Sequence, residues 1–342
     1  MVSAACFLFI QSTWASDQKG PDPLFQSDEI LDVRITAPIT TLRRERPLED
    51  QLPAQIQYMD SNGVAVDLDI RIRARGRFRH RADICRFPPV RLNFKKSTVK
   101  NTLFAKQDKL KLVTHCQTSS RYTESVLREY LTYRILNIMT DASYKVRLLR
   151  ITYVNTEKNS REDVRYGFLI EHRDRLAERL QMRVLDIPST EASKLNADYS
   201  NLISLFHYMI GNTDFSQIQA AAGERCCHNH VLFQDGDQPI YSIPYDFDQA
   251  GIVEARYATP NPQFGLRTVR QRLYRGRCIN NKLLSATISH YAQQKDAVMA
   301  LIAEDPAIAE GTRKRVTSYL DMFYKNIASE KTIDRDLIKK CG

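Results

Sequence analysis

Acidic and amide side chains gather in three short segments of this 342-residue chain. The segments are GNTD at residues 211–214, HNHVLF at 228–233 and IPYDFDQAG at 243–251. Carboxylates beside apolar runs cost free energy unless a positive group meets them. Mg²⁺ takes carboxylate and amide oxygens as ligands, together with the oxygens of a phosphate. The three segments therefore indicate a site for a hard divalent cation.

The order of the three segments also indicates the kind of reaction in which the metal would take part. An Asp in a loop after a helix, then an Asn, then an Asp after a hairpin is the order of parts that phosphoryl transfer uses in kinase-like folds. The first Asp orients or deprotonates the hydroxyl acceptor there, and the other two residues hold the metal. Taken alone, Asp246 and Asp248 would instead end a strand and form the next turn, because Asp is a preferred turn residue. Asp214 alone would be an ordinary loop acid.

Strands predominate in the part of the chain that precedes these segments. Short alternating stretches lie between residues 30 and 94, and Asn62-Gly63 between two of them is a hairpin signal. In LDIRIRAR, residues 68–75, apolar residues point to one face and charged residues to the other. A helix is predicted at residues 121–139, and strands return in VRLLRITYVN and VRYGFLIEH.

Helices predominate after residue 198. One helical segment ends at Gly211-Asn212, a short hairpin follows around residues 235–237, and most of the last third is helical. A strand-rich half with one helix, followed by a helical half with a small hairpin, predicts an α+β protein in two lobes.

Seven motifs, in this order, resemble the pattern of the CotH family of spore-coat-type atypical kinases. They are IRIRARG, FPPVRLNFKK, SVLREYLTYRIL, YGFLIEH, MIGNTD, HNHVLF and IPYDFDQAG, between about residues 68 and 251. The resemblance implies a protein-kinase-like fold with ATP or another nucleotide between a strand-rich N-lobe and a mainly helical C-lobe. It also implies Mg²⁺ or Mn²⁺ on the acidic motif and phosphate transfer to a protein hydroxyl. We expect a β-rich extension at residues 16–66, an N-lobe at 67–175 and a C-lobe at 176–342.

The family's site residues can be carried over onto matching positions of this chain. Asp214 matches the catalytic-loop Asp, Asn229 the metal-side Asn and Asp246 the metal-binding Asp. Asp248 would be a second or outer ligand. Glu129 matches the helix glutamate that pairs with a phosphate-binding base, and by its helical position it is either solvated or turned toward a cleft.

The nucleotide-binding part of the resemblance contains one departure. In the strand PVRLNF, Arg91 is retained, but Asn93 stands where the family often has a Lys. The resemblance then implies that Arg91 or Lys95 holds the nucleotide phosphates, although an Arg and a Lys are not interchangeable at such a site. Glu171 and His172 would lie near the adenine.

Export is predicted from the first residues and from the cysteines. MVSAACFLFIQSTWASDQ has a short apolar run and a small-residue cleavage pattern, so we expect a signal peptide at residues 1–15, although no Lys or Arg precedes the run. The alternatives are an apolar strand or a truncated start. Six cysteines remain, without zinc-site spacing, and predict three disulfides of undetermined pairing in a periplasmic or secreted protein. No run is long enough for a transmembrane span.

The net charge of +10 makes an anionic partner plausible, such as a nucleotide or an acidic, hydroxyl-bearing protein substrate. The main alternative to a kinase is a catalytically silent kinase-like scaffold that binds a cell-envelope partner through its arginines, at 71–81 and 267–277. A nucleic-acid binder is disfavoured because no recognised nucleic-acid motif accompanies the charge. The letters His228-Asn229-His230 alone do not support a nuclease, although strand alternation would put both histidines on one side.

Overall fold

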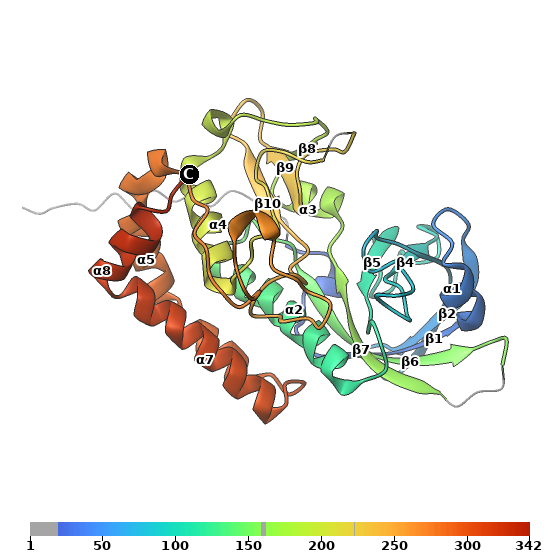
Figure 1. Cartoon of the computed structure of the whole chain (residues 1–342). Helices are drawn as coiled ribbons and strands as arrows, with labels where there is room; N and C mark the ends of the chain where they lie inside the picture. The colour runs from blue at the N-terminus through green and yellow to red at the C-terminus, as the bar shows by residue number, and fades with distance from the viewer. Residues whose placement is uncertain (1–19, 159–161, 222) are drawn as a thin grey trace, which may run out of the picture.

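The computed structural model describes residues 20–158, 162–221 and 223–342. A strand-rich N-terminal part is followed by a mainly helical C-terminal part, so the predicted α+β class is confirmed (Figure 1). The signal peptide predicted at residues 1–15 lies outside the described residues.

The N-terminal part is a closed barrel of seven strands in the order β1-β2-β3-β4-β5-β7-β6. The strands are β1 (Leu31–Ala37), β2 (Leu52–Met59), β3 (Ala65–Ala74), β4 (Val90–Phe94), β5 (Lys109–Val113), β6 (Val146–Asn155) and β7 (Asp163–Ile170). All neighbours pair antiparallel except β1 and β6, which close the barrel as a parallel pair. A short helix, α1 (Ile39–Glu45), connects β1 to β2. The predicted extension at 16–66 therefore supplies strands to the same barrel as residues 67–175.

Strand β3 has the alternation that its sequence predicts. Leu68, Ile70 and Ile72 are buried inside the barrel, whereas Asp69 and Arg71 are exposed. Burial of each such aliphatic side chain contributes roughly 1.5–3 kcal/mol, which fixes the register, because a slip by one residue would turn the apolar side outward. The charged side of β3 consequently lies on the outer face of the barrel.

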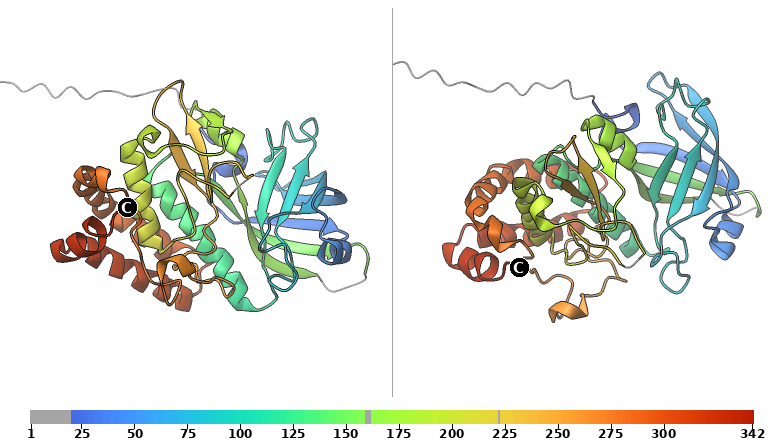
Figure 2. Two further views of the ribbon diagram at one scale, coloured as in Figure 1. Left: turned by 45° about the horizontal axis from the view of Figure 1, so that its top comes forward. Right: turned by 90° about the horizontal axis from the view of Figure 1, so that it is seen from above.

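Helix α2 (Ser120–Met139) lies between the barrel and the C-terminal helices (Figure 2). The Tyr133 ring packs edge-on against Phe168 of β7, with ring centroids 5.6 Å apart. Because both parts of the protein cover this helix, even Arg128 and Glu129 are buried on it. The helical spacing of Leu127, Leu131, Ile135 and Ile138 accounts for only one side of its buried surface.

The C-terminal part combines helices with a small antiparallel sheet in the order β10-β9-β8. Its elements are α3 (Arg173–Arg179), β8 (Arg183–Leu185), α4 (Ala197–Ile210), β9 (His230–Gln234), β10 (Tyr241–Pro244), α5 (Asn281–Gln293), α6 (Lys295–Glu304), α7 (Glu310–Ile327) and α8 (Glu330–Ile333). Among the described residues, no helix combines the length and apolar character needed to cross a membrane.

The six cysteines after residue 20 form three disulfides, as many as their number predicts. The pairs are Cys85–Cys116, Cys226–Cys227 and Cys278–Cys341. The third disulfide joins the end of the chain to the beginning of the α5 region, where the Cys278 amide also donates to the Gly342 carbonyl. Disulfides persist in oxidising compartments, so the three pairs are consistent with a periplasmic or extracellular location.

Gly211 gives a test of how α4 ends. It has a φ of 67°, and a Cβ there would lie 2.1 Å from the Tyr319 hydroxyl oxygen. We expect Gly211→Ala to lower the free energy of unfolding by about 2 kcal/mol or more, because a left-handed φ costs a non-glycine residue about 1–2 kcal/mol and the tyrosine must also move. Urea unfolding measures this change.

The same substitution in a Tyr319→Phe background provides the control. Without the hydroxyl, the nearest Tyr319 ring atom, Cζ, lies 3.4 Å from the added Cβ. Gly211→Ala should then cost less in this background, since only the backbone conformation opposes it. An equal cost in both backgrounds would show that the hydroxyl contact does not matter.

Candidate functional site

A cavity of 870 Å³ lies where the barrel, α2 and two loops of the C-terminal part meet. The barrel side supplies residues of the β3–β4 region and Lys111 of β5, and α2 supplies Glu129 and Tyr133. Opposite them, the C-terminal part supplies Asp214, Asn229, Asp246 and Asp248, among others. The three acidic segments singled out in the sequence therefore converge on one cavity.

Asp214 is held in its loop from three directions. The Asn212 side-chain oxygen accepts from the Asp214 amide at 2.9 Å, and the His228 Nε2 donates to Asp214 Oδ1 at 2.7 Å. The Asn229 amide nitrogen donates to the Asp214 carbonyl at 2.7 Å and to Oδ2 at 3.1 Å. The hydrogen bond from His228 raises the pKa of that imidazole. Asp214 thus presents a fixed carboxylate to the cavity.

Arg275 fixes the backbone on both sides of Asp214. Its Nη1 donates to the carbonyls of Thr213 at 2.9 Å and Phe215 at 2.7 Å. The guanidinium also lies over the rings of Phe215 and Phe264, 4.5 and 4.7 Å from their centroids. In the scaffold alternative this arginine cluster would bind a cell-envelope partner, but Arg275 instead supports the loop that carries Asp214.

Asp246 and Asn229 both have left-handed backbone, with φ of 63° and 56°. Such values are uncommon outside glycine, although Asp and Asn tolerate them best. The Asp246 amide donates to the Tyr133 hydroxyl at 2.8 Å. Phe247 is fully buried between the rings of Tyr133 and Phe206. This buried ring anchors the turn on which the two neighbouring carboxylates reach the cavity.

Asp248 lies deeper than Asp246. Its Oδ2 accepts from the Tyr257 hydroxyl at 3.2 Å. Burial, and next the nearby charge of Asp246, raise the pKa of Asp248 to about 7. A carboxylate with this pKa is half-protonated in neutral solution unless a cation joins it, as expected for an acid in a low-dielectric site.

Glu129 faces the cavity and is buried, rather than solvated. Its basic partner is Arg79, whose Nη1 lies 3.9 Å from Glu129 Oε2 and whose Nη2 donates to the Thr114 carbonyl at 2.6 Å. Burial, together with the charge of Asp248, raises the pKa of Glu129 well above its usual value. The sequence indicated Glu129 but not Arg79, which was grouped only with the arginines at 71–81 that a scaffold would present to a partner.

Four further cations line the barrel wall of the cavity: Arg77, which pairs with Glu224, and Arg75, Arg91 and Lys111. The Nε atoms of Arg75 and Arg91 are buried and have no hydrogen-bond partner. Lys111 lies over the Tyr245 ring, 4.2 Å from its centroid, and burial followed by the charge of Arg75 lowers the pKa of its ammonium group to about 7. The sequence analysis did not select Arg75 or Lys111, although alternation in KLKLV does turn Lys111 away from the barrel interior.

Lys95, the other predicted phosphate-binding residue, lies elsewhere. It follows β4 in an exposed turn and does not line the cavity. Asn93 also lies outside the lining, where its amide donates to Gln51 Oε1 at 2.6 Å. Of the two predicted phosphate-binding residues, Arg91 is therefore the one that the fold brings to the acidic loops.

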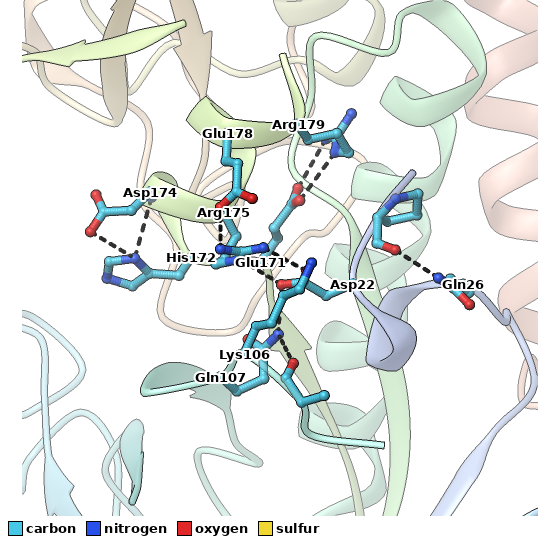
Figure 3. A network of polar contacts seen from close by, with 12 residues as sticks. Asp22, Gln26, Lys106, Gln107, Glu171, His172, Asp174, Arg175, Glu178 and Arg179 are labelled. Carbon is cyan, nitrogen blue, oxygen red and sulfur yellow. Dashed lines mark hydrogen bonds and ion pairs between the residues drawn. The ribbon is translucent and has the colours of Figure 1, made fainter. Parts of the chain in front are cut away.

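Glu171 and His172, predicted near the adenine, do not line the cavity. They belong instead to a polar network around the start of α3 (Figure 3). Arg179 donates to both carboxylate oxygens of Glu171, at 3.1 and 2.9 Å. The His172 ring begins α3 by accepting from the Asp174 amide at 3.3 Å. In the same network, Asp22 binds Arg175 through two hydrogen bonds of 2.6 and 2.8 Å.

The two histidines beside Asn229 do not share one side of a strand, contrary to the expected alternation. Strand β9 begins only at His230, because the left-handed Asn229 interrupts the extended backbone. His228 is partly exposed beside Asp214. His230 is buried, with its Nε2 at 3.0 Å from that of His207.

The donor set is suited to a hard cation that also binds a phosphate. In the part of the chain that the structure describes, no group of three or more His, Cys, Asp or Glu side chains is arranged to hold a metal by itself. Asn229, Asp246 and Asp248 offer amide and carboxylate oxygens at one cavity. Mg²⁺ is usually bound by one or two carboxylates plus phosphate oxygens, so this set fits it without an all-protein cage.

Comparison with known proteins gives a structural similarity but no sequence match. No known protein family's sequence profile matches the chain, and no curated protein sequence matches it. The crystal structure of the Helicobacter pylori proinflammatory kinase CtkA is similar to it with a TM-score of 0.38 and 12% sequence identity, over 83% of this chain and 92% of that chain. A TM-score this low does not establish a common fold.

Asp248 predicts how stability depends on pH when metal is removed. Because its folded-state pKa of about 7 exceeds the unfolded value of about 3.9, the unfolded chain loses this proton first, and stability falls as pH rises between the two values. We expect Asp248→Asn to gain about 2–3 kcal/mol relative to wild type between pH 5 and pH 8, since the variant has no charge to bury there.

Urea unfolding in a metal chelator at the two pH values measures the effect. Asp237→Asn, an exposed substitution in the β9–β10 turn, is the matched control and should show no such gain. If the difference between Asp248→Asn and wild type is the same at both pH values, Asp248 is not a buried acid with a raised pKa.

Proposed function

We propose that this chain is an exported, CotH-like atypical kinase that transfers a phosphate from ATP or another nucleotide to a protein hydroxyl. The observation that carries the proposal is the division of one cavity into two walls. One wall presents Asp214, Asn229 and Asp246, and the other presents Arg75, Arg91 and Lys111. A divalent cation with a phosphate chain is the ligand that satisfies both walls.

Each side chain has a role that its surroundings support. Asn229, Asp246 and Asp248 would hold Mg²⁺ or Mn²⁺, which neutralises charge on the phosphate oxygens. Arg91 and Lys111 would bind the donor phosphates, because guanidinium and ammonium groups form charge-assisted hydrogen bonds with them. Asp214 would accept the proton of the attacking hydroxyl, a task for which its fixed position at the cavity is suited.

The chain keeps a lysine for the donor despite Asn93. Lys111 lies one strand away, on β5, opposite Arg91 in the sheet register. Although Asn93 replaces the lysine that the family often has, Lys111 supplies a lysine to the cationic wall of the cavity. This argues for an active phosphotransferase over a catalytically silent scaffold.

The scaffold alternative depends on arginines that are free to meet a partner. Arg270 and Arg272 instead lie over the Tyr319 ring, 5.0 and 3.8 Å from its centroid, and Arg270 also pairs with Glu254 at 2.8 Å. Together with Arg275 they are internal supports of the C-terminal part. Three of the five arginines of the 267–277 cluster are consequently engaged within the protein, whereas Arg267 is exposed.

Two substitutions separate binding from transfer. With Mn²⁺ and ATP at about 100 times the dissociation constant, wild type should gain about 2.7 kcal/mol of stability. Asp246→Asn should lose this gain, because it removes a metal ligand. Asp214→Asn should keep it but transfer phosphate about 10²–10⁴-fold more slowly, the usual contribution of a general base.

Thermal shift and transfer of labelled phosphate to protein or water measure the two effects, with Asp237→Asn as the matched control. If no nucleotide stabilises wild type in the presence of either metal, the scaffold is the better description. If Asp214→Asn transfers phosphate as fast as wild type, the assigned role of Asp214 is wrong.

A further inference from the structure

A ladder of like charges crosses three neighbouring strands of the barrel. Arg73 of β3 lies opposite Arg91 of β4, and Arg91 lies opposite Lys111 of β5. One pleat further along the same face, Arg71 and Lys109 lie on either side of Asn93. Like charges directly opposite one another destabilise a sheet. Repulsion between these charges therefore lowers the stability of the folded state, and a bound anion would relieve it.

The ladder has no carboxylate partner of its own. Arg71 and Arg73 donate only to the backbone carbonyls of Gln51 and Leu48, and no ion pair to any of the five cations is formed within residues 20–158, 162–221 and 223–342. The pKa of the Arg91 guanidinium is lowered by burial and then by the charges of Arg73 and Arg75. These charges are thus concentrated without an ion pair in the described part of the chain, and the Asp246 carboxylate acts on Lys111 only from across the cavity.

The ladder also has a direction. Arg91 and Lys111 line the cavity, and Arg73 lies beside Arg91 at the same level of the sheet but outside the lining. Arg71 and Lys109 lie one pleat farther along the strands, also outside the lining. Lys109 and Arg71 are exposed. A chain of phosphates that begins beside the acidic loops can therefore continue outward over this face.

The two residues expected beside an adenine do not reach the cavity where the chain crosses from β7 to α3. The Glu171 amide is already bound to the Lys145 carbonyl, and neither Glu171 nor His172 lines the cavity. Ile170, which does line it, lies directly opposite Lys111 in the sheet. Beside the crossing, the cavity therefore presents the Lys111 ammonium group next to the apolar Ile170 and Val113, and this charge favours an anionic ligand.

We propose that the site recognises its donor by the phosphoanhydride chain alone, and that inorganic polyphosphate serves as donor, with its terminal phosphates in the cavity and the rest along Arg73, Arg71 and Lys109. The proposal rests on the proposed phosphotransferase function and names its substrate class. In the reaction, the acceptor hydroxyl oxygen forms a bond to the terminal phosphorus as the bridging P–O bond breaks. The shortened polyphosphate leaves with that electron pair, and the hydroxyl proton goes to Asp214.

Binding to wild-type protein with Mn²⁺ tests recognition of the chain. The probes are tripolyphosphate, a longer polyphosphate, ATP and AMP, compared by calorimetry. We expect tripolyphosphate to bind within about tenfold of ATP, the longer chain to bind more tightly, and AMP to bind weakly. If ATP binds far more tightly than tripolyphosphate, the protein recognises the nucleoside as well as the phosphates. That result would overturn the inference but leave the kinase proposal intact.

Variants along the ladder test its path. Lys111→Met should weaken all phosphoanhydride ligands by about tenfold or more, because a charge-assisted hydrogen bond is lost in the cavity. Lys109→Met should weaken only the longer polyphosphate. Lys331→Met, an exposed substitution on α8, is the matched control and should change neither. If Lys109→Met does not reduce the advantage of the longer chain, the outward path is wrong.

Phosphate transfer separates the two proposals. Labelled tripolyphosphate should phosphorylate the acceptors that ATP does, and Asp214→Asn should slow both reactions equally. Transfer from ATP but not from tripolyphosphate would refute the donor inference alone. Ladder-dependent binding of polyphosphate without transfer from either donor would refute the phosphotransferase function, and the donor role with it, but would support recognition of the phosphate chain.

Discussion

Opposite charges face each other across one cavity, and in the described part of the chain neither Asp246 and Asp248 on one wall nor Arg91 and Lys111 on the other form an ion pair. The acidic loops bring Asp246 and Asp248 together, although burial opposes the ionisation of Asp248. The barrel brings Arg91 and Lys111 together on opposed strands. Removal of ions from water costs several kcal/mol each unless geometry and hydrogen bonds compensate. A ligand that carries both a metal cation and a polyanion compensates both walls together, so binding and stability are expected to be coupled.

Much of the remaining polar interior holds these two walls in position. Arg79 and Glu129 join the β3–β4 region to α2. Asp22 accepts from Arg175 of α3 and from Gln107, which precedes β5, and so links the two parts of the protein away from the cavity (Figure 3). Removing one member of a buried pair leaves an uncompensated charge. Arginines that look like surface charge in the sequence are therefore internal cross-links.

The sequence allowed the α+β order, the alternation of β3 and the meeting of three acidic segments to be predicted, because each depends on local periodicity or on the order of motifs. It did not reveal the partner of Glu129, since Arg79 reaches it from an irregular segment after β3. It also did not separate His228 from His230, because a left-handed residue between them is not visible in a polar–apolar pattern. The alternation in KLKLV would have placed Lys111 on the outer face of its strand. Only the closed barrel, however, shows that this face lies opposite the acidic loops.

The wall that would hold the metal concentrates several unfavourable features in a few residues. Asn229 and Asp246 have left-handed backbone, and Asp248 is a buried acid. Backbone strain of this kind costs about 1–3 kcal/mol per residue and persists only where the surroundings enforce it. Here the enforcing contacts are the fully buried Phe247 and the Tyr133 hydroxyl that receives the Asp246 amide. Helix α2 supplies Tyr133, which accepts from the Asp246 amide, and also Glu129, which pairs with Arg79 of the β3–β4 region. A shift of α2 would therefore disturb both walls of the cavity together, which makes this helix the element on which the geometry of the whole site depends.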